Sequence, residues 1–537
     1  MQGHPTAAAD RRWVILVVVS VAQLMVVLDS TIVNIALPSA QQALGFANSD
    51  RQWVVTSYAL AFGSLLLVGG RLGDMYSRKW VLITGLIGFA VASAIGGAAV
   101  SFVMLVAARA LQGAFGAILA PAALGTLVST FRDPRERRRA FAVFGSVAVG
   151  GGAVGLILGG VLTQYLSWRY TLFVNLIFAA IAVAGALAYI RSSRPATSPR
   201  MDWPGAVLAC TGLFLIVFGF SHAETAGWTA TLTLGSLVLG AVLLAAFVVA
   251  EQRSSHPLLP LRVILDRTRG GSYVAVGITG IALFAIFLFL TFYMQQVKGY
   301  SPLTTGLLFL PLVAGILIAS TLYSALPTVG PRPLVTAGML LGAGGTAYLA
   351  QLTVTSSYLG GVLPALLIMG LGFGMIFASA VNSATAGVPR QDSGVASALV
   401  NTMQQVGGSI GIAVLSTIAA SETTSYLLAH HISPQAPAIA ATHGYTLAFT
   451  ISAALFGLGA ILAILMLPSR KRLEELTSEA SALIPEPEPP AAAPAPAPQH
   501  QVASALQPAV KVMPVGLLCC SPVIDPGLPP AAARPSL

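Results

Sequence analysis

The sequence predicts an all-α integral membrane protein with fourteen transmembrane helices, and three observations lead to this prediction. Charged residues make up only 9% of the 537 residues, whereas a soluble domain carries about 25%. The mean hydropathy is +0.82. The chain also contains fourteen mostly apolar stretches, each near the length of about 20 residues that a helix needs to cross a bilayer. Lipid is therefore the expected surrounding of most of the chain.

The apolar stretches form a group of six, a pair and a second group of six. They span residues 13–37, 53–70, 81–100, 103–129, 140–166, 170–190, 205–221, 231–250, 272–296, 304–325, 334–352, 358–387, 394–418 and 445–467. The first stretch follows two arginines, as in a signal peptide, but it is too long for the apolar part of one. We therefore expect a retained first span that ends before Pro38.

This grouping predicts five regions. They are a cytosolic N-terminus at residues 1–12, an N-terminal six-helix bundle at 13–190, a linker with two extra transmembrane helices at 191–271, a C-terminal six-helix bundle at 272–467 and a cytosolic tail at 468–537. The tail is rich in proline and alanine and cannot bury a core, so we expect it to be disordered.

The 28 lysine and arginine residues indicate the orientation of the spans. If both termini are cytoplasmic, only Arg51, Arg169 and Lys298 fall in the outer loops, and nearly all the others lie in inner segments. Membrane proteins concentrate basic loop residues on the cytoplasmic side. Topology therefore explains the net charge of +10, which gives no reason to expect nucleic acid as a partner.

Two charged residues, Asp29 and Arg109, lie inside predicted spans. A charge at the centre of a bilayer costs roughly 2.5–3.5 kcal/mol, so residues retained there usually have a function. Asp29 lies about 13 Å, and Arg109 about 9 Å, from the outer end of its span at 1.5 Å of helix rise per residue. We expect both to face a common polar cavity, in direct contact or through water.

Such a pair could couple transport to protons. Burial favours a protonated carboxyl group, whereas a nearby guanidinium favours the carboxylate. Competition between these effects would let Asp29 take up and release a proton, with Arg109 tuning the exchange. The alternatives are an aspartate that only bonds to neighbouring helices and an arginine that only pins helices together.

The segment from Gly70 to Lys79 joins the second and third spans on the predicted inner side. Asp74 and Arg78 are four residues apart and could pair across a helical turn, or the carboxylate could cap the N-terminus of another helix. A surface contact of this kind can form and break easily, as the contacts of a gate must. Gly70, Gly73, Asp74, Arg78 and Lys79 are therefore candidate gate residues, and the alternative is a solvated basic loop.

In the fifth span, Gly151, Gly155 and Gly159 recur every four residues, and Gly160 follows them. This spacing gives one helix face without side chains, which lets another helix approach closely. We expect this face to lie at a helix interface, either as part of a moving contact or as ordinary close packing.

Several segments resemble motifs of a known family. The segment from Gly70 to Lys79 is similar to the signature loop of the major facilitator superfamily. The motifs that narrow the resemblance to its fourteen-span drug:proton antiporters are LDSTIVNIALP at 28–38, WVVTSY at 53–58, RALQG at 109–113, WR at 168–169 with FVN at 173–175, GYSP at 299–302 and SALVNTMQQVGG at 397–408. The resemblance covers residues 13–467.

The resemblance implies a major facilitator fold, in which two six-helix bundles are related by internal repeats and enclose a cavity. It also implies a proton-coupled antiporter that exports hydrophobic or cationic small molecules, such as drugs, antibiotics or biosynthetic products, by alternating access across the bacterial cell (inner) membrane. Arg109 matches the arginine implicated in proton coupling. Two positions depart from the family: Leu156 stands where a proline usually follows Gly155, and residues 330–333 lack the aspartate of a second signature loop.

Polar residues in the spans complete the expected site. The candidates for the substrate cavity are Asp29, Asn34, Gln112, Asn401, Gln404 and Gln405. The expected partners are the lipid bilayer, a small-molecule substrate and protons. A proton gradient would drive transport without a cofactor, no metal site is expected, and a monomer is favoured.

Other functions stay open at this point. An uptake carrier or a uniporter for a specific metabolite would have a similar sequence, and a membrane sensor or scaffold would use the tail to bind its partner. An enzyme is not expected, because it would need paired acids, a metal-ligand cluster or an activated nucleophile within the membrane.

Overall fold

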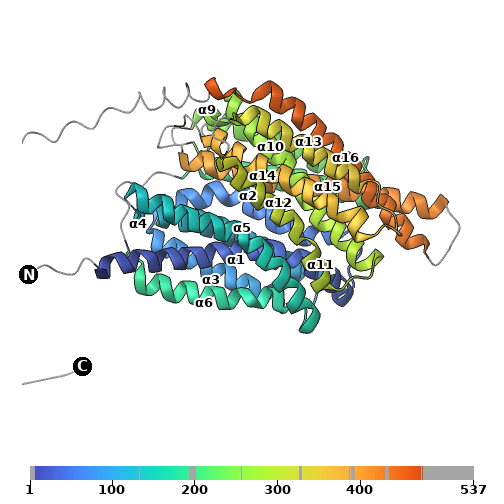
Figure 1. Cartoon of the computed structure of the whole chain (residues 1–537), viewed down its shortest axis with the longest axis horizontal. Coiled ribbons are helices and arrows are strands. Elements are labelled where there is room, and N and C mark those ends of the chain that lie inside the picture. Colours follow the sequence, from blue (N-terminus) through green and yellow to red (C-terminus); the bar gives the residue numbers. More distant parts are fainter. Residues whose placement is uncertain are drawn as a thin grey trace, which may run out of the picture. The chain divides into compact units, whose positions relative to one another are not determined.

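The computed structural model describes residues 6–131, 133–192, 201–254, 257–259, 261–325, 329–385, 388, 393–429, 435–472 and 475. These residues form helices joined by short connections. Figure 1 shows two groups of long helices, one from each half of the chain. Most of the predicted tail lies outside the described residues.

Six helices form the N-terminal bundle. They are α1 (Thr6–Leu44), α2 (Arg51–Met75), α3 (Arg78–Gly97), α4 (Phe102–Thr130), α5 (Pro134–Tyr165) and α6 (Tyr170–Tyr189). Helix α4 packs against α2 and α3, α1 packs against α5 and α6, and α3 also contacts α6.

The C-terminal bundle repeats this arrangement. Its elements are α10 (Arg267–Ala285), the π-helical turns η1 (Ile286–Leu290) and η2 (Tyr293–Val297), α11 (Pro302–Leu308), α12 (Leu310–Ala325), α13 (Pro331–Leu349), the π-helical turn η3 (Tyr358–Val362), α14 (Leu363–Thr385), α15 (Ser393–Ala429) and α16 (Ala436–Met466). Helix α14 packs against α12 and α13, α10 against α15 and α16, and α13 against α16. Helices α10, α12, α13, α14, α15 and α16 thus take the places of α1 to α6, which is an internal repeat.

Two additional helices stand beside the junction of the bundles. Helices α7 (Trp203–Ala226) and α8 (Thr231–Arg253) pack against each other, and α7 also lies against α2 and α15. The short helix α9 (Leu261–Ile264) follows α8 and leads into the C-terminal bundle.

The two bundles meet along two sets of helices, α2 against α15 and α5 against α11 and α12. We call the end with the connection between α1 and α2 (residues 45–50) the distal end, and the end with the connection between α2 and α3 (residues 76–77) the proximal end. At the distal end, Gln295 Nε2 donates a hydrogen bond to Ile35 O at 3.0 Å, and Leu303 N donates one to Gln164 Oε1 at 3.3 Å. The bundles are therefore in contact there.

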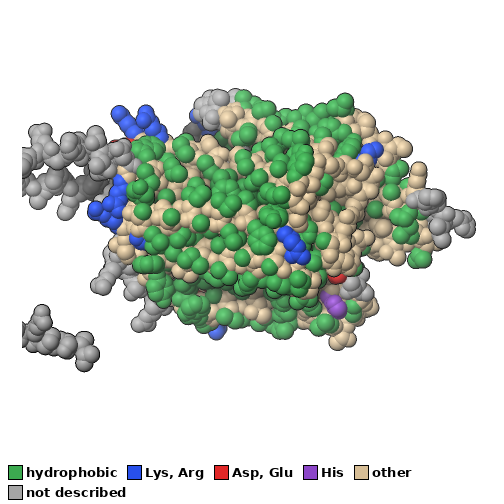
Figure 2. Space-filling model, turned by 90° about the horizontal axis from the view of Figure 1, so that it is seen from below, with side chains coloured by type: hydrophobic (Ala, Val, Ile, Leu, Met, Phe, Trp, Pro, Cys, Tyr) green, Lys and Arg blue, Asp and Glu red, His purple; other side chains and the backbone are tan. Residues whose placement is uncertain are grey.

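Among the described residues, thirteen helical segments are long and apolar enough to cross a membrane. The fourteenth predicted span, 334–352, is largely helix α13, whose mean hydropathy is lowered by Arg332 in its first turn and by four glycines further along. Helix α13 is nonetheless packed against both α14 and α16. Figure 2 shows apolar side chains covering much of one face of the molecule, as expected for a surface in contact with lipid.

Capping residues determine where several helices begin. Asp133 lies immediately before α5, and its Oδ1 accepts hydrogen bonds from the backbone N–H groups of Arg135 and Glu136 in the first turn at 2.9 and 3.0 Å. Asp202 and Asp266 cap α7 and α10 in the same way. Each side chain satisfies N–H groups that have no partner within the helix.

Two local predictions are wrong. Helix α1 does not end before Pro38 but continues to Leu44, because groups around a transmembrane helix can satisfy the carbonyl that a proline leaves unpaired. Asp74 and Arg78 do not share a helical turn, since α2 ends at Met75 and α3 begins at Arg78 with extended backbone between them.

The glycine face of α5 lies against α1. A Cβ atom added to Gly155 would overlap Thr31 Oγ1, and one added to Gly151 would lie 3.0 Å from Leu24 Cδ1. Gly159 is similarly crowded by α1. The absence of side chains therefore lets the two backbones approach each other closely.

Gly160 lies at a different interface. A Cβ atom there would lie 2.5 Å from Leu303 Cα in α11, and the carbonyl of Leu156 lies against Gly306 in the same helix. Helix α5 is continuous through Leu156, the position where the related motif has proline. It contacts α1 with one side and the C-terminal bundle with another.

Replacing Gly155 by leucine should destabilise the protein, because the new side chain would push α1 away from α5. Overpacking of a close-packed interface typically costs about 1–3 kcal/mol. Gly152→Leu is the matched control on the same helix, since a Cβ atom there meets nothing within 4 Å. Thermal unfolding of the detergent-solubilised protein should show a lowered midpoint for Gly155→Leu alone, and equal midpoints would contradict the close contact.

Candidate functional site

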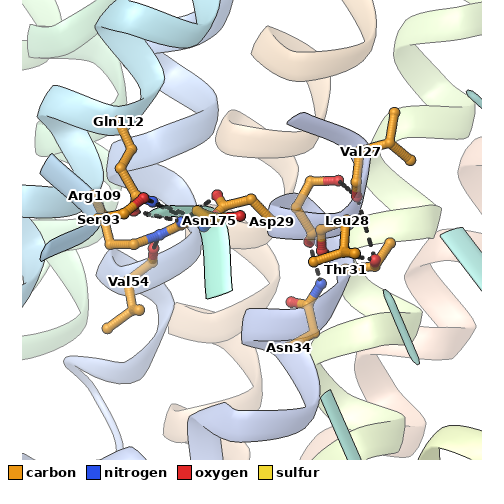
Figure 3. Close-up of polar contacts among 11 residues, drawn as sticks. Val27, Leu28, Asp29, Thr31, Asn34, Val54, Ser93, Arg109, Gln112 and Asn175 are labelled. Carbon is orange, nitrogen blue, oxygen red and sulfur yellow. Dashed lines mark hydrogen bonds and ion pairs between the residues drawn. The ribbon is translucent and has the colours of Figure 1, made fainter. Parts of the chain in front are cut away.

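Asp29 lies in a hydrogen-bonded cluster at which helices of the N-terminal bundle meet (Figure 3). Helix α1 supplies Asp29, α3 supplies Ser93, α4 supplies Arg109 and Gln112, and α6 supplies Asn175. Arg109 is 2% exposed and the other four residues are 0% exposed. The cluster is therefore enclosed within one bundle.

Both carboxylate oxygens of Asp29 have partners. Oδ2 accepts a hydrogen bond from Arg109 Nη1 at 2.6 Å, which forms an ion pair. Oδ1 accepts hydrogen bonds from Gln112 Nε2 at 2.9 Å and from Asn175 Nδ2 at 2.7 Å. Hydrogen bonds to an ionised group are stronger than those between neutral groups, so three donors hold the carboxylate in place.

The guanidinium of Arg109 has further partners in α2 and α4. Its Nε donates a hydrogen bond to Val54 O at 3.2 Å, and Nη1 also donates to Gln112 Oε1 at 2.8 Å. Its Cζ lies 4.4 Å from the centroid of the Tyr58 ring, within the range of a cation–π interaction. Helix α2 thus offers a carbonyl and an aromatic face to the positive charge.

Ser93 connects the two amide side chains. Its Oγ accepts hydrogen bonds from Gln112 Nε2 at 2.6 Å and from Asn175 Nδ2 at 3.3 Å. Within the described part of the chain, Asn175 Oδ1 and Tyr58 OH have no hydrogen-bond partner and are available if the cluster rearranges. Gln112, which we expected on the wall of a cavity, is instead enclosed in the cluster around Asp29.

Protonation of Asp29 would remove the negative charge from this cluster. Removing one partner of a buried ion pair typically costs about 3–5 kcal/mol, because the other charge is left uncompensated. A proton on Asp29 would take away the counter-charge of Arg109 while leaving its contacts with Val54 and Tyr58. The connection between α1 and α4 would then weaken, whereas that between α2 and α4 would persist.

The other cavity candidates lie outside the cluster. Asn34 donates a hydrogen bond to a carbonyl of its own helix at 2.9 Å, and Figure 3 shows it apart from Asp29. Asn401, Gln404 and Gln405 lie on α15, where Asn401 is exposed and the two glutamines are partly exposed. No group of three or more His, Cys, Asp or Glu residues gathers within the described ranges.

The candidate gate residues lie at the proximal end. Arg78 Nη1 donates a hydrogen bond to a carbonyl of α4 at 2.8 Å, and Lys79 Nζ donates one to a carbonyl of α6 at 2.9 Å. A Cβ atom at Gly70 or Gly73 would meet nothing within 4 Å. The side chain of Asp74 lies outside the part of the chain that the structure describes.

Sequence reasoning missed Ser93, Tyr58 and Asn175 as members of the cluster. Serine and tyrosine in an apolar span give little signal, because both are common in helices that pack against other helices. Asn175 did offer a signal, since an amide within the apolar stretch 170–190 needs a polar partner.

Comparison with known proteins identifies relatives along most of the chain. Residues 19–412 match the Major Facilitator Superfamily. The puromycin resistance protein of Streptomyces alboniger is 46% identical over 475 residues, which cover 88% of this chain and 94% of that protein. The cephamycin export protein of Amycolatopsis lactamdurans is 40% identical over 422 residues, with coverage of 76% and 85%. The tetracenomycin C resistance and export protein of Streptomyces glaucescens is 33% identical over 413 residues, with coverage of 76% of each.

Solved structures share the fold. A bacterial homologue of the human lysosomal transporter Spinster, in an inward-facing and unoccupied conformation, superposes with a TM-score of 0.61 at 15% identity, covering 89% of this chain and 99% of that one. An autoinhibited peptide transporter of the POT family gives a TM-score of 0.61 at 15% identity, with coverage of 84% and 97%. These findings confirm the predicted fold and the family resemblance. The chain therefore belongs to the Major Facilitator Superfamily and is a multi-pass membrane transporter of small molecules.

Proposed function

We propose that this chain is a proton-coupled antiporter that exports hydrophobic or cationic small molecules, antibiotics among them, by alternating access. The observation that carries the proposal is the buried ion pair between Asp29 and Arg109. The relatives support the direction of transport, because their names describe resistance to, or export of, puromycin, cephamycin and tetracenomycin C.

The proton would act on the attachment of α1 to the rest of its bundle. Asp29 is the residue through which α1 joins the cluster, and the groups it binds come from α4 and α6. Neutralising the carboxylate weakens its bonds with Arg109, Gln112 and Asn175, because each of these bonds is charge-assisted. Loss of the proton would restore them, so the two states of Asp29 correspond to two strengths of attachment.

Helix α5 connects this change to the interface between bundles. Helix α1 packs along α5 at Gly151, Gly155 and Gly159, and α5 contacts α11 of the C-terminal bundle at Gly160. A shift of α1 therefore moves a helix that contacts the other bundle. Alternating access requires a change of this kind, since the two bundles must rock against each other around the substrate.

The substrate would bind between the bundles, where α15 lies against α2. A Cβ atom at Gly63 of α2 would lie 3.0 Å from the Cβ of Gln405, so Gln405 is at this interface. We propose that Asn401, Gln404 and Gln405 present polar groups to the substrate from α15. Apolar surroundings with a few amide groups suit a compound that is recognised mainly by shape and area.

The basic residues determine the proposed orientation. The proximal end would face the cytoplasm together with both termini, and the distal end would face outward, in the bacterial cell membrane. The gate residues Gly70, Gly73, Asp74, Arg78 and Lys79 would then lie on the cytoplasmic side, where the hydrogen bonds from Arg78 to α4 and from Lys79 to α6 would hold the inner end of the bundle.

Labelling of single cysteines will test this orientation. In a background in which the three native cysteines are replaced by serine, Ala47→Cys should react with a membrane-impermeant maleimide in intact cells, because its exposed position lies at the distal end. Ser192→Cys, exposed at the proximal end, should react only after the cells are permeabilised. The reverse pattern would overturn the orientation.

Asp29→Asn should reduce gradient-driven export to the background level, because an amide cannot carry the transported proton. Asn retains an oxygen that can accept from Gln112 and Asn175, so the protein should still reach the membrane. The measurement is efflux of labelled puromycin from de-energised bacteria after an inward proton gradient is imposed.

Asp50→Asn is the matched control for this experiment, since Asp50 lies outside the cluster and its side chain makes no cap hydrogen bond. Normal export by Asp29→Asn would contradict the proton-carrying role. Gradient-driven accumulation of the compound would instead favour an uptake carrier.

A double-mutant cycle separates the structural role of the ion pair from its role in transport. Arg109→Gln alone should destabilise the protein by about 3–5 kcal/mol, because it leaves a buried carboxylate without its counter-charge. Adding Asp29→Asn should recover much of the unfolding midpoint without recovering gradient-driven export. If the decrease of the unfolding midpoint in the double variant equals the sum of the decreases in the two single variants, the ion pair is not the stabilising interaction.

A further inference from the structure

Arg51 is a buried cation at the distal end of the molecule. It is the first residue of α2 and is only 8% exposed, although the sequence predicted it in an outer loop. None of the ion pairs formed within the described ranges includes Arg51, and its Nε has no hydrogen-bond partner. A buried charge needs some other compensation.

Three aromatic rings provide that compensation. The Cζ atom of Arg51 lies 4.3 Å from the ring centroid of Phe292, 5.4 Å from that of Tyr445 and 6.0 Å from that of Phe289. Its Nη1 donates a hydrogen bond to Tyr445 OH at 3.2 Å. We call Phe289, Phe292 and Tyr445 the aromatic cage; all three are at most 4% exposed. Desolvated cation–π contacts of this kind are the strong ones.

The cage and the cation come from different bundles. Arg51 belongs to α2 of the N-terminal bundle, whereas Phe289 lies in η1, Phe292 lies between η1 and η2, and Tyr445 lies in α16. Two hydrogen bonds cross the same end of the molecule, from Gln295 to α1 and from α11 to α5. Arg51 therefore adds a charge-based contact to a junction that otherwise uses backbone and amide groups.

A cavity of about 850 Å³ lies next to this contact. It is lined by Arg51 and Tyr445 themselves and also by Asn48, Trp228 and Glu422. A guanidinium that leaves the cage would thus enter a space whose wall is mixed, with apolar side chains and the carboxylate of Glu422. The cavity is therefore a second location that Arg51 could occupy, close to an opposite charge.

We propose that Arg51 is the latch of the distal gate. With the distal end closed, the aromatic cage holds the guanidinium and joins the bundles; opening requires the guanidinium to withdraw into the adjacent cavity. The proposal rests on the alternating-access function proposed above and assigns to Arg51 a role in setting the balance between the closed and open states. Loss of the latch should shift that balance toward the open state by about tenfold.

Distance measurements between two spin labels will test the latch on the full-length protein in lipid nanodiscs. The parent carries serine at all three native cysteines, with Tyr165→Cys on α5 and Gln296→Cys on η2, which are both exposed and lie on different bundles at the distal end. A closed distal end gives a short distance and an open one a longer distance. Arg51→Met should raise the ratio of long to short distances by about tenfold.

Phe292→Leu, which removes the nearest ring, should give a similar shift, and Tyr445→Phe, which removes only the hydroxyl, a smaller one. The ratio for Arg51→Lys should lie between those of the parent and of Arg51→Met, because an ammonium keeps the charge but lacks the planar guanidinium. Arg169→Met is the matched control: Arg169 stacks on Trp168 and bonds to carbonyls at the distal end of α3, all within the N-terminal bundle. It should leave the ratio unchanged.

A ratio that stays within twofold of the parent in both Arg51→Met and Phe292→Leu would overturn the latch, as would an equal shift in Arg169→Met. The measurement needs neither a gradient nor a substrate. If the Arg51→Met and Phe292→Leu variants keep the parent's ratio of long to short distances and also export as the parent does, the latch alone is rejected. If the ratio shifts but the parent itself exports nothing, the latch is supported and the proposed transport function is rejected.

Discussion

The ion pair between Asp29 and Arg109 is the constraint on which the N-terminal bundle depends. Either charge alone in a low-dielectric interior is costly, so the surrounding helices bring polar groups within hydrogen-bond distance of one point. Helix α3 supplies a hydroxyl, α4 and α6 supply amides, and α2 supplies a carbonyl and an aromatic ring. The cluster around Asp29 therefore joins five helices at one point.

Helix α1 is held in two physically different ways. Charge-assisted hydrogen bonds to α4 and α6 fix it on the side of Asp29, and close approach to the glycines of α5 fixes it at Gly151, Gly155 and Gly159. Hydrogen bonds to a carboxylate depend on its protonation, whereas packing against glycine depends on shape alone. In the proposed mechanism, a proton would thus release the first attachment while the second would keep α1 and α5 together, so that the two helices would move as a unit.

The sequence predicted fourteen spans, thirteen of which are long and apolar enough to cross a membrane, and it singled out the two charged residues that form the ion pair, because lipid makes charges rare and apolar stretches long. The repeat was expected from the family resemblance. The sequence was insufficient where the outcome depended on tertiary contacts. Ser93 and Tyr58 joined the cluster through helix packing that no local pattern specifies, and α1 continued beyond Pro38. Arg51 was predicted in a loop, but the rings that bury it are more than 200 residues away in the sequence.

The two repeats use the same packing for different tasks. Helix α1 carries the buried aspartate, whereas its counterpart, α10 with η1 and η2, has no charged residue from Gly270 to Val297 and is rich in phenylalanine instead. The aromatic rings of that segment receive Arg51 from the other bundle. In the proposed mechanism, one repeat therefore holds the group that responds to protons, and the other holds the apolar surface on which a cation closes the distal end. If both repeats carried a buried carboxylate, protonation would weaken contacts in both bundles; with the carboxylate in one repeat, the proposed loosening would be confined to the N-terminal bundle.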